Sequence, residues 1–162
     1  MTDYEKNIWE ILETVCDPEI PVLSVVDLGV VRKVDLEKDK ELTVTITPTY
    51  SGCPAQIVME ANIRKALSHL KEKVDVKTVL SPAWTTDWLT ENGKKKLKDF
   101  GIAPPEDDFS EIKLFRKHAA VHCPKCDSTD TTEISAFGST ACKALYKCNS
   151  CNEPFEYFKC HR

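Results

Sequence analysis

Two Cys-x-x-Cys pairs near the C-terminus constrain this chain more than any other feature. They are Cys123-Pro-Lys-Cys126 and Cys148-Asn-Ser-Cys151. Each pair can form a tight turn that points two thiolates at one ion, and four thiolates around one ion are a typical ligand set of structural zinc. A segment of about 45 residues rarely has a stable core without such a staple. The C-terminal part is therefore predicted to be a small four-cysteine, zinc-ribbon-like domain.

The position of the cysteines favours metal over disulfides. Six of the eight cysteines lie in the last 40 residues. The first ten residues, MTDYEKNIWE, lack the cationic and apolar segments of a secretory signal. Disulfides need an oxidising compartment, so we expect a cytoplasmic protein with metal-bound thiolates. Four thiolates can also hold iron or an iron–sulfur cluster, but zinc ranks first because a ribbon needs a redox-silent ion that forms the fold.

Four further residues of this segment are surplus to a four-ligand site. We interpret them as packing or surface residues of a compact ribbon. The alternative is a second thiolate site with exposed cysteine ligands, which would be incomplete or shared with a partner. The residues are Cys142, Cys160, His122 and His161.

Charge and motifs exclude several classes of function. Residues 1–108 carry 14 basic and 20 acidic residues (14 − 20 = −6), and residues 109–162 carry 8 and 6 (8 − 6 = +2). This balance does not favour a nucleic-acid partner. No apolar run reaches the ~18 residues of a membrane span, so we expect no membrane partner. The sequence also lacks the zincin, phosphate-loop and serine-triad motifs. Catalysis by the chain alone is therefore poorly supported, although whether the chain is an enzyme stays open.

The first part is predicted to be an α+β domain with a small three-stranded sheet packed by helices. A capping box at Thr2-x-x-Glu5 starts a helix that Pro18 ends. Gly101 and the proline pair after it mark a boundary. The predicted domains are 1–101 and 118–162, with a linker over 102–117. The other predicted elements are strands 30–36, 42–47 and 74–80 and helices 54–73 and 86–100.

Two places in the first part carry candidate chemistry. Cys53 lies between a Thr-rich strand and a helix that Pro54 opens, where a helix N-terminus would lower the pKa of its thiol. It is then either a nucleophile or soft-metal ligand, or a buried, inert cysteine. The loop Asp17-Pro-Glu19 offers two carboxylates, which are either a rigid solvated loop or partners of Cys53 as metal ligands or as acid and base.

These same residues carry a family resemblance. Asp17-Pro-Glu-Ile-Pro-Val, Asp27-Leu-Gly-Val-Val and Cys53-Pro resemble the SufT-like iron–sulfur assembly domain. The segments Trp84-Thr-Thr-Asp-Trp-Leu, Gly101-Ile-Ala-Pro-Pro and Phe137-Gly-Ser-Thr-Ala-Cys resemble the PaaD family, also called PaaJ, whose members are subunits of the bacterial phenylacetyl-CoA ring epoxidase system. With these segments the resemblance spans nearly the whole chain.

The resemblance implies an accessory role in aerobic phenylacetate catabolism. The implied partners are the oxygenase and reductase subunits of a multicomponent monooxygenase, with a homodimer left open. The implied cofactors are structural zinc in the ribbon and transient iron or an iron–sulfur cluster at Cys53, with Asp17 and Glu19 beside it. Because a cluster normally takes four ligands, one thiolate favours handing a centre over rather than holding it. The alternative is a structural subunit whose zinc ribbon is an interaction module.

Overall fold

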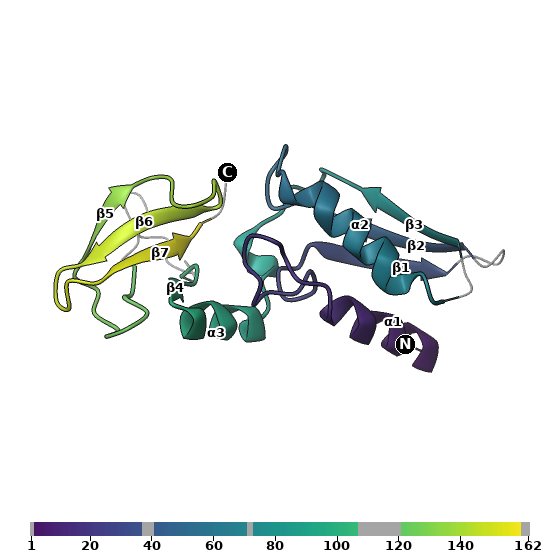
Figure 1. The fold of residues 1–162 in the computed structure, drawn as a ribbon, viewed down its shortest axis with the longest axis horizontal. Coiled ribbons are helices and arrows are strands. Elements are labelled where there is room, and N and C mark those ends of the chain that lie inside the picture. The colour runs from purple at the N-terminus through teal and green to yellow at the C-terminus, as the bar shows by residue number, and fades with distance from the viewer. Residues whose placement is uncertain (1, 37–40, 71–72, 107–120, 160–162) are drawn as a thin grey trace. The chain divides into compact units, whose positions relative to one another are not determined.

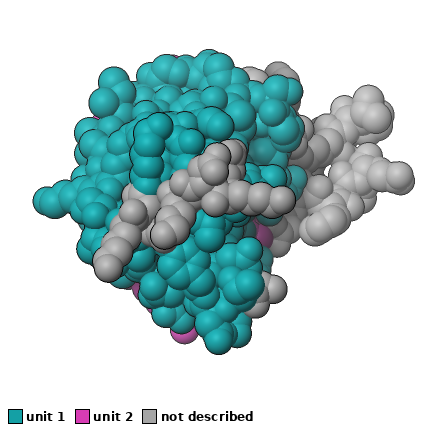
Figure 2. Space-filling view, turned by 90° about the vertical axis from the view of Figure 1, so that its right-hand side faces the viewer, with its two compact units in different colours: residues 1–93 teal, residues 94–162 magenta. Residues whose placement is uncertain are grey.

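The computed structural model describes residues 2–36, 41–70, 73–106 and 121–159. The chain divides into two compact units, Met1–Gly93 and Lys94–Arg162, which Figure 2 colours separately. Each unit is described by itself. Residues 107–117 of the predicted linker lie outside the described residues, so the predicted domain boundaries stay a prediction.

Unit 1 contains the predicted three-stranded sheet, in the order β1-β2-β3. β1 (Val31–Leu36) and β2 (Glu41–Ile46) form an antiparallel hairpin, and β3 (Lys73–Thr78) runs parallel to β2. In β2, Leu42, Val44 and Ile46 are fully buried, as their alternation predicts. Thr43 is buried too, because β2 is the central strand, so the expected wet face of this strand is largely covered.

Two helices complete the layers of unit 1. α1 (Asp3–Glu13) starts with the predicted capping box of Thr2 and Glu5, and it ends at Thr14, before Pro18. α2 (Ala55–Leu67) connects β2 to the parallel strand β3 and lies across one face of the sheet (Figure 1). It ends at Leu67, six residues before the predicted helix end at residue 73, because Lys73 is already the first residue of β3. The α+β class with a three-stranded sheet is confirmed. The buried apolar side chains of the two helices are Ile8, Leu12, Ala55, Met59, Ile63 and Leu67.

The predicted helix 86–100 is wrong as one element, because it is interrupted. A short turn η1 (Thr86–Trp88) is followed by α3 (Glu91–Phe100). Between them, Thr90 donates its N–H to the Asp27 carbonyl (2.9 Å) and its hydroxyl to the Asp27 carboxylate (3.1 Å). Asn92 donates to the same carboxylate oxygen at 3.0 Å. These contacts with the buried aspartate therefore fix the break between η1 and α3. Because they join residues far apart in the sequence, no local sequence pattern predicts them.

Unit 2 contains a four-stranded sheet in the order β4-β7-β6-β5. Its hairpins join β5 (Thr131–Ser135), β6 (Lys143–Cys148) and β7 (Pro154–Phe158). β4 (Ile102–Ala103) pairs parallel with β7, so these two residues of the predicted linker belong to the sheet. The core is small and includes two cysteines, as expected of a ribbon that depends on metal. Its members are Ala103, Val121, Cys123, Ala144, Tyr146, Cys148 and Phe155.

Candidate functional site: a four-cysteine centre and a buried thiol

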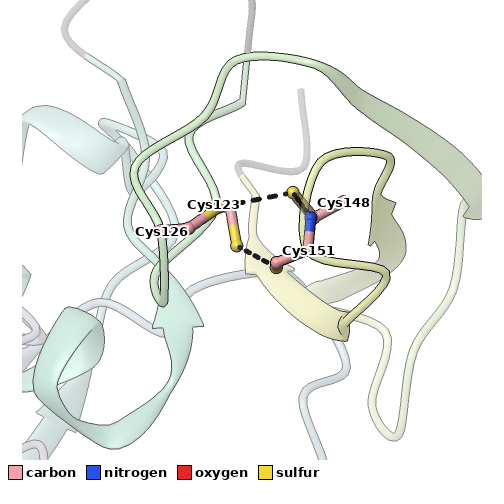
Figure 3. Close-up of side chains that lie close together, drawn as sticks. All are labelled: Cys123, Cys126, Cys148 and Cys151. Carbon is pink, nitrogen blue, oxygen red and sulfur yellow. Dashed lines mark hydrogen bonds between the residues drawn. The ribbon is translucent and has the colours of Figure 1, made fainter.

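The two Cys-x-x-Cys pairs meet at one point in unit 2 (Figure 3). All four sulfur atoms lie within 4.8 Å of one another. Cys123 Sγ is 3.8 Å from Cys151 Sγ, and Cys126 Sγ is 3.5 Å from Cys148 Sγ. A tetrahedral site with Zn–S bonds of about 2.3 Å has sulfur–sulfur edges of about 3.8 Å. The four thiols therefore fit zinc with little movement.

Local backbone geometry explains why each pair forms a turn. Asp127 and Asn152, each next after the second cysteine of its pair, have φ of 62° and 61°. This left-handed region suits Asp and Asn better than other side-chain-bearing residues. In the second turn the Cys151 N–H donates to Cys148 Sγ at 3.5 Å, which lowers the pKa of the Cys148 thiol to about 6. The contact with Cys148 raises the pKa of Cys126, and burial raises that of Cys151. Cys148 is therefore the first of these three thiols to ionise.

The surplus residues of the ribbon lie apart from this cluster or outside the described residues. Cys142 is buried rather than exposed, and its Sγ is 3.0 Å from Thr140 Oγ1. His122 Nδ1 lies 3.8 Å from the carboxylate of Asp127. Within residues 121–159, the group of side chains that could hold a metal ion consists of the four paired cysteines and includes neither of these residues. Cys160 and His161 lie outside the described residues.

Cys53 lies at the end of the loop that leads from β2 into α2. Gly52 has φ of +88°, which lets the chain turn, and Pro54 is the N-cap of α2. The Cys53 side chain is buried, while Ser51, Gly52 and Pro54 around it are exposed. A hydrogen bond joins it to the side chain of Thr49, which the sequence presented only as part of a Thr-rich strand. The thiol is therefore just below the surface.

The acidic loop lies near Cys53, which the sequence could not show. Asp17 is buried, and its Oδ1 accepts hydrogen bonds from the N–H groups of Glu19 (2.7 Å) and Ile20 (2.8 Å), so the loop is held rigidly. The carboxylates of Glu19 and Asp17 both act electrostatically on the Cys53 thiol. Both carboxylates are thus close enough to Cys53 to act on the charge of its thiol.

The environment of Cys53 raises the pKa of its thiol. Burial is the main cause, and the negative charges of Glu19 and Asp17 add to it. Hydrogen bonds from Ala55 and Thr49 lower the pKa, but they do not compensate. Our expectation of a lowered pKa is therefore wrong. The helix N-terminus acts as expected, but the burial and the carboxylates, which come from tertiary packing, outweigh it. The thiol therefore stays protonated until a base takes its proton or a metal ion that binds the sulfur displaces it.

We expect Glu19→Gln to lower the pKa of the Cys53 thiol, because it removes a negative charge that opposes the thiolate. At a fixed pH near 7 the variant then has more thiolate and reacts faster with iodoacetamide. The measurement is the alkylation rate of Cys53 as a function of pH, followed by mass spectrometry. Glu13→Gln, an exposed acid at the end of α1, is the control and should leave the profile unchanged. An unchanged profile in Glu19→Gln would show that Glu19 does not act on Cys53.

Each of the two units is similar to a known protein family. Residues 107–159 match the PaaD zinc beta ribbon domain, and residues 5–78 match the iron–sulfur cluster assembly protein family. The chain is 48% identical over 155 residues to an Escherichia coli (strain K12) protein named as one of the subunits of a "Putative 1,2-phenylacetyl-CoA epoxidase", covering 95% of this chain and 92% of that protein. The chain belongs to the PaaD family. The resemblance in its motifs is thereby confirmed, and so is the assignment of the C-terminal PaaD segment as a zinc ribbon.

The first unit of this PaaD chain is also similar to shorter proteins. The chain is 38% identical over 92 residues to the Bacillus subtilis (strain 168) "Fe-S protein maturation auxiliary factor YitW", covering 56% of this chain and 89% of that protein. The crystal structure of a "Domain of Unknown Function DUF59 from Bacillus anthracis" matches with a TM-score of 0.54 and 28% identity, over 58% of this chain and 91% of that one. None of the helices in the described part of the PaaD chain has the length and apolar character needed to cross a membrane.

Proposed function

We propose that this protein is an accessory maturation subunit of the phenylacetyl-CoA epoxidase system in aerobic phenylacetate catabolism. In this role Cys53 receives iron or an iron–sulfur cluster and passes it to a client subunit. The observation that carries the proposal is the grouping of Cys53 with Asp17 and Glu19 in a unit that matches the iron–sulfur cluster assembly family. The maturation factor from Bacillus subtilis, which aligns with this unit, supports the same role.

The chemistry of the site favours transfer over storage. A soft cation that binds Cys53 Sγ displaces the thiol proton, which leaves to solvent or to a neighbouring carboxylate. The charges of Asp17 and Glu19 attract the cation and compensate for the partial burial of the sulfur. A cluster normally takes four ligands, and this site offers one thiolate with two carboxylates. Such a site binds weakly enough to release its cargo.

The ribbon serves this function as a rigid docking module. We propose that Cys123, Cys126, Cys148 and Cys151 hold one zinc ion, which stabilises the ribbon and takes no part in the transfer. The proposed partners are the oxygenase and reductase subunits of the epoxidase in the cytoplasm. A homodimer of this chain is the alternative assembly. The chain has no catalytic activity of its own in this proposal.

The test uses the purified full-length protein under anaerobic conditions. Incubation with ferrous iron and sulfide should turn the protein brown and give the charge-transfer absorption of thiolate-bound iron. Adding iron-free epoxidase should transfer that iron to the epoxidase, measured as metal content after the two proteins are separated. A protein that binds no iron beyond that found with Cys53→Ser would contradict the proposal.

The second candidate is a structural subunit with no transfer role. The name of the Escherichia coli relative, which calls it a subunit of the epoxidase, favours this candidate. It predicts stable co-purification with the oxygenase at a fixed stoichiometry. It also predicts that the iron content of the oxygenase does not depend on Cys53.

A further inference from the structure

Three exposed apolar side chains stand beside the Cys53 site, and we call them the apolar rim: Ile57, Val58 and Leu80. We propose that the apolar rim docks the client protein, and that the matching client surface presents apolar side chains together with lysine or arginine. This inference rests on the proposed function, because it names the surface that brings a client to Cys53.

The fold places the three rim residues around one edge of the sheet. Ile57 and Val58 lie in the first turn of α2, which begins two residues after Cys53, and they are 76% and 44% exposed. β2 and β3 are parallel, so the loop after β2 and the end of β3 lie at the same edge. Leu80, which is 59% exposed, follows the end of β3.

Side-chain contacts tie these two segments together. Gln56, in the first turn of α2, donates to Thr78 Oγ1 at 3.1 Å, and Thr78 donates to Glu60 on the next turn at 2.8 Å. The first turn of α2 is thus joined to the end of β3, two residues before Leu80 (Figure 1). The rim is therefore a structured surface next to the site.

The rim residues do not serve the core of unit 1. α2 buries Ala55, Met59 and Ile63 at a spacing of four residues, and Ile57 and Val58 lie outside that stripe. Single exposed apolar side chains are common, whereas apolar side chains that share one part of the surface are typical of an interaction site. Among the described residues of unit 1, the remaining exposed large apolar side chain is Leu36. It pairs with Leu42 at the start of β2, so it lies at the opposite edge of the sheet.

The net charge of unit 1 favours one kind of partner. Residues 1–93 carry 10 basic and 16 acidic residues (10 − 16 = −6). The charged groups that act on Cys53 are Glu19 and Asp17, which are both negative. A basic surface is attracted to this edge, and its cations would offset the two carboxylates. A second copy of this chain would bring the same negative charge, so self-association through the rim is disfavoured.

The experiment compares a rim variant with a matched control. Ile57→Gln combined with Leu80→Gln removes apolar area and leaves the charge unchanged. Leu36→Gln makes the same change at the opposite edge of the sheet, on a side chain that is 50% exposed. Binding of the full-length proteins to purified iron-free epoxidase is measured by calorimetry at two salt concentrations. We expect binding at least about tenfold weaker for the rim variant, unchanged binding for the control, and weaker binding of the parent at higher salt.

Each outcome tests either the docking surface or the proposed function. Parent-like binding by the rim variant, or no binding by the parent, overturns the docking inference. A parent that dimerises by light scattering, with the dimer lost in the rim variant, overturns it in favour of a second copy. Cys53 alkylation at the parent rate shows that the site of the rim variant is intact. If Cys53→Ser binds normally but the epoxidase still receives its iron, the proposed function fails while the docking surface stands.

Discussion

Cys148→Ser is expected to release the zinc and unfold the ribbon of residues 121–159. The ribbon core is small and contains two of the four metal-site cysteines, Cys123 and Cys148. Structural zinc contributes about 10–16 kcal/mol of apparent binding free energy to domains of this kind, which is more than a core of that size can replace. Unit 1 keeps its fold because its sheet and helices bury a core of their own. The measurements are zinc content by mass spectrometry and thermal unfolding by circular dichroism.

Cys142→Ser is the matched control for the zinc site. Cys142 is buried in the same unit, but it is not part of the four-cysteine cluster, and serine can keep the contact with Thr140. We expect one zinc ion per chain in this variant, with a loss of stability of about 1 kcal/mol. A folded ribbon without zinc in Cys148→Ser would contradict the structural role. Redox-active iron at the four cysteines of the parent protein would replace zinc as the resident metal.

Cys53→Ser is expected to reduce iron loading of the epoxidase sharply while the protein stays folded. Serine is close to cysteine in size and can form the hydrogen bond with Thr49, so the free energy of unfolding should change by about 1 kcal/mol or less. Serine is a poor ligand for a soft metal ion, so the iron content of epoxidase made in the same cells should fall at least about tenfold. Growth on phenylacetate should fall with it. Asp17→Asn should have the same effect more weakly, because it removes one of the two charges beside the thiol.

Cys16→Ser serves as the control for Cys53. Cys16 is the other cysteine of unit 1 and is exposed, so its replacement should leave iron loading and growth unchanged. Unfolding of unit 1 in Cys53→Ser would show that the thiol is a core residue. Normal stability together with normal iron content would move the structural-subunit role to first place.

Local sequence determined the parts of this protein that depend on near neighbours. The spacing within each Cys-x-x-Cys pair predicts the turn, and the four cysteines of two such turns are a ligand set that suits one ion. The capping box at Thr2 and the hairpin of β1 and β2 form where the sequence predicts them. These features depend on hydrogen bonds and side-chain periodicity over a few residues, and such patterns can be recognised in a single sequence.

Only the tertiary structure decided the character of Cys53 and the break before α3. The sequence shows a cysteine before a helix, which favours a thiolate, but packing buries the thiol and brings Glu19 and Asp17 close to it, and both effects raise its pKa. Asp27 likewise interrupts the predicted helix 86–100 through hydrogen bonds to Thr90 and Asn92. Burial and electrostatic interaction depend on which segments meet in space. The pattern along the chain specifies each segment, but the distance between two segments is fixed only when the core between them is packed.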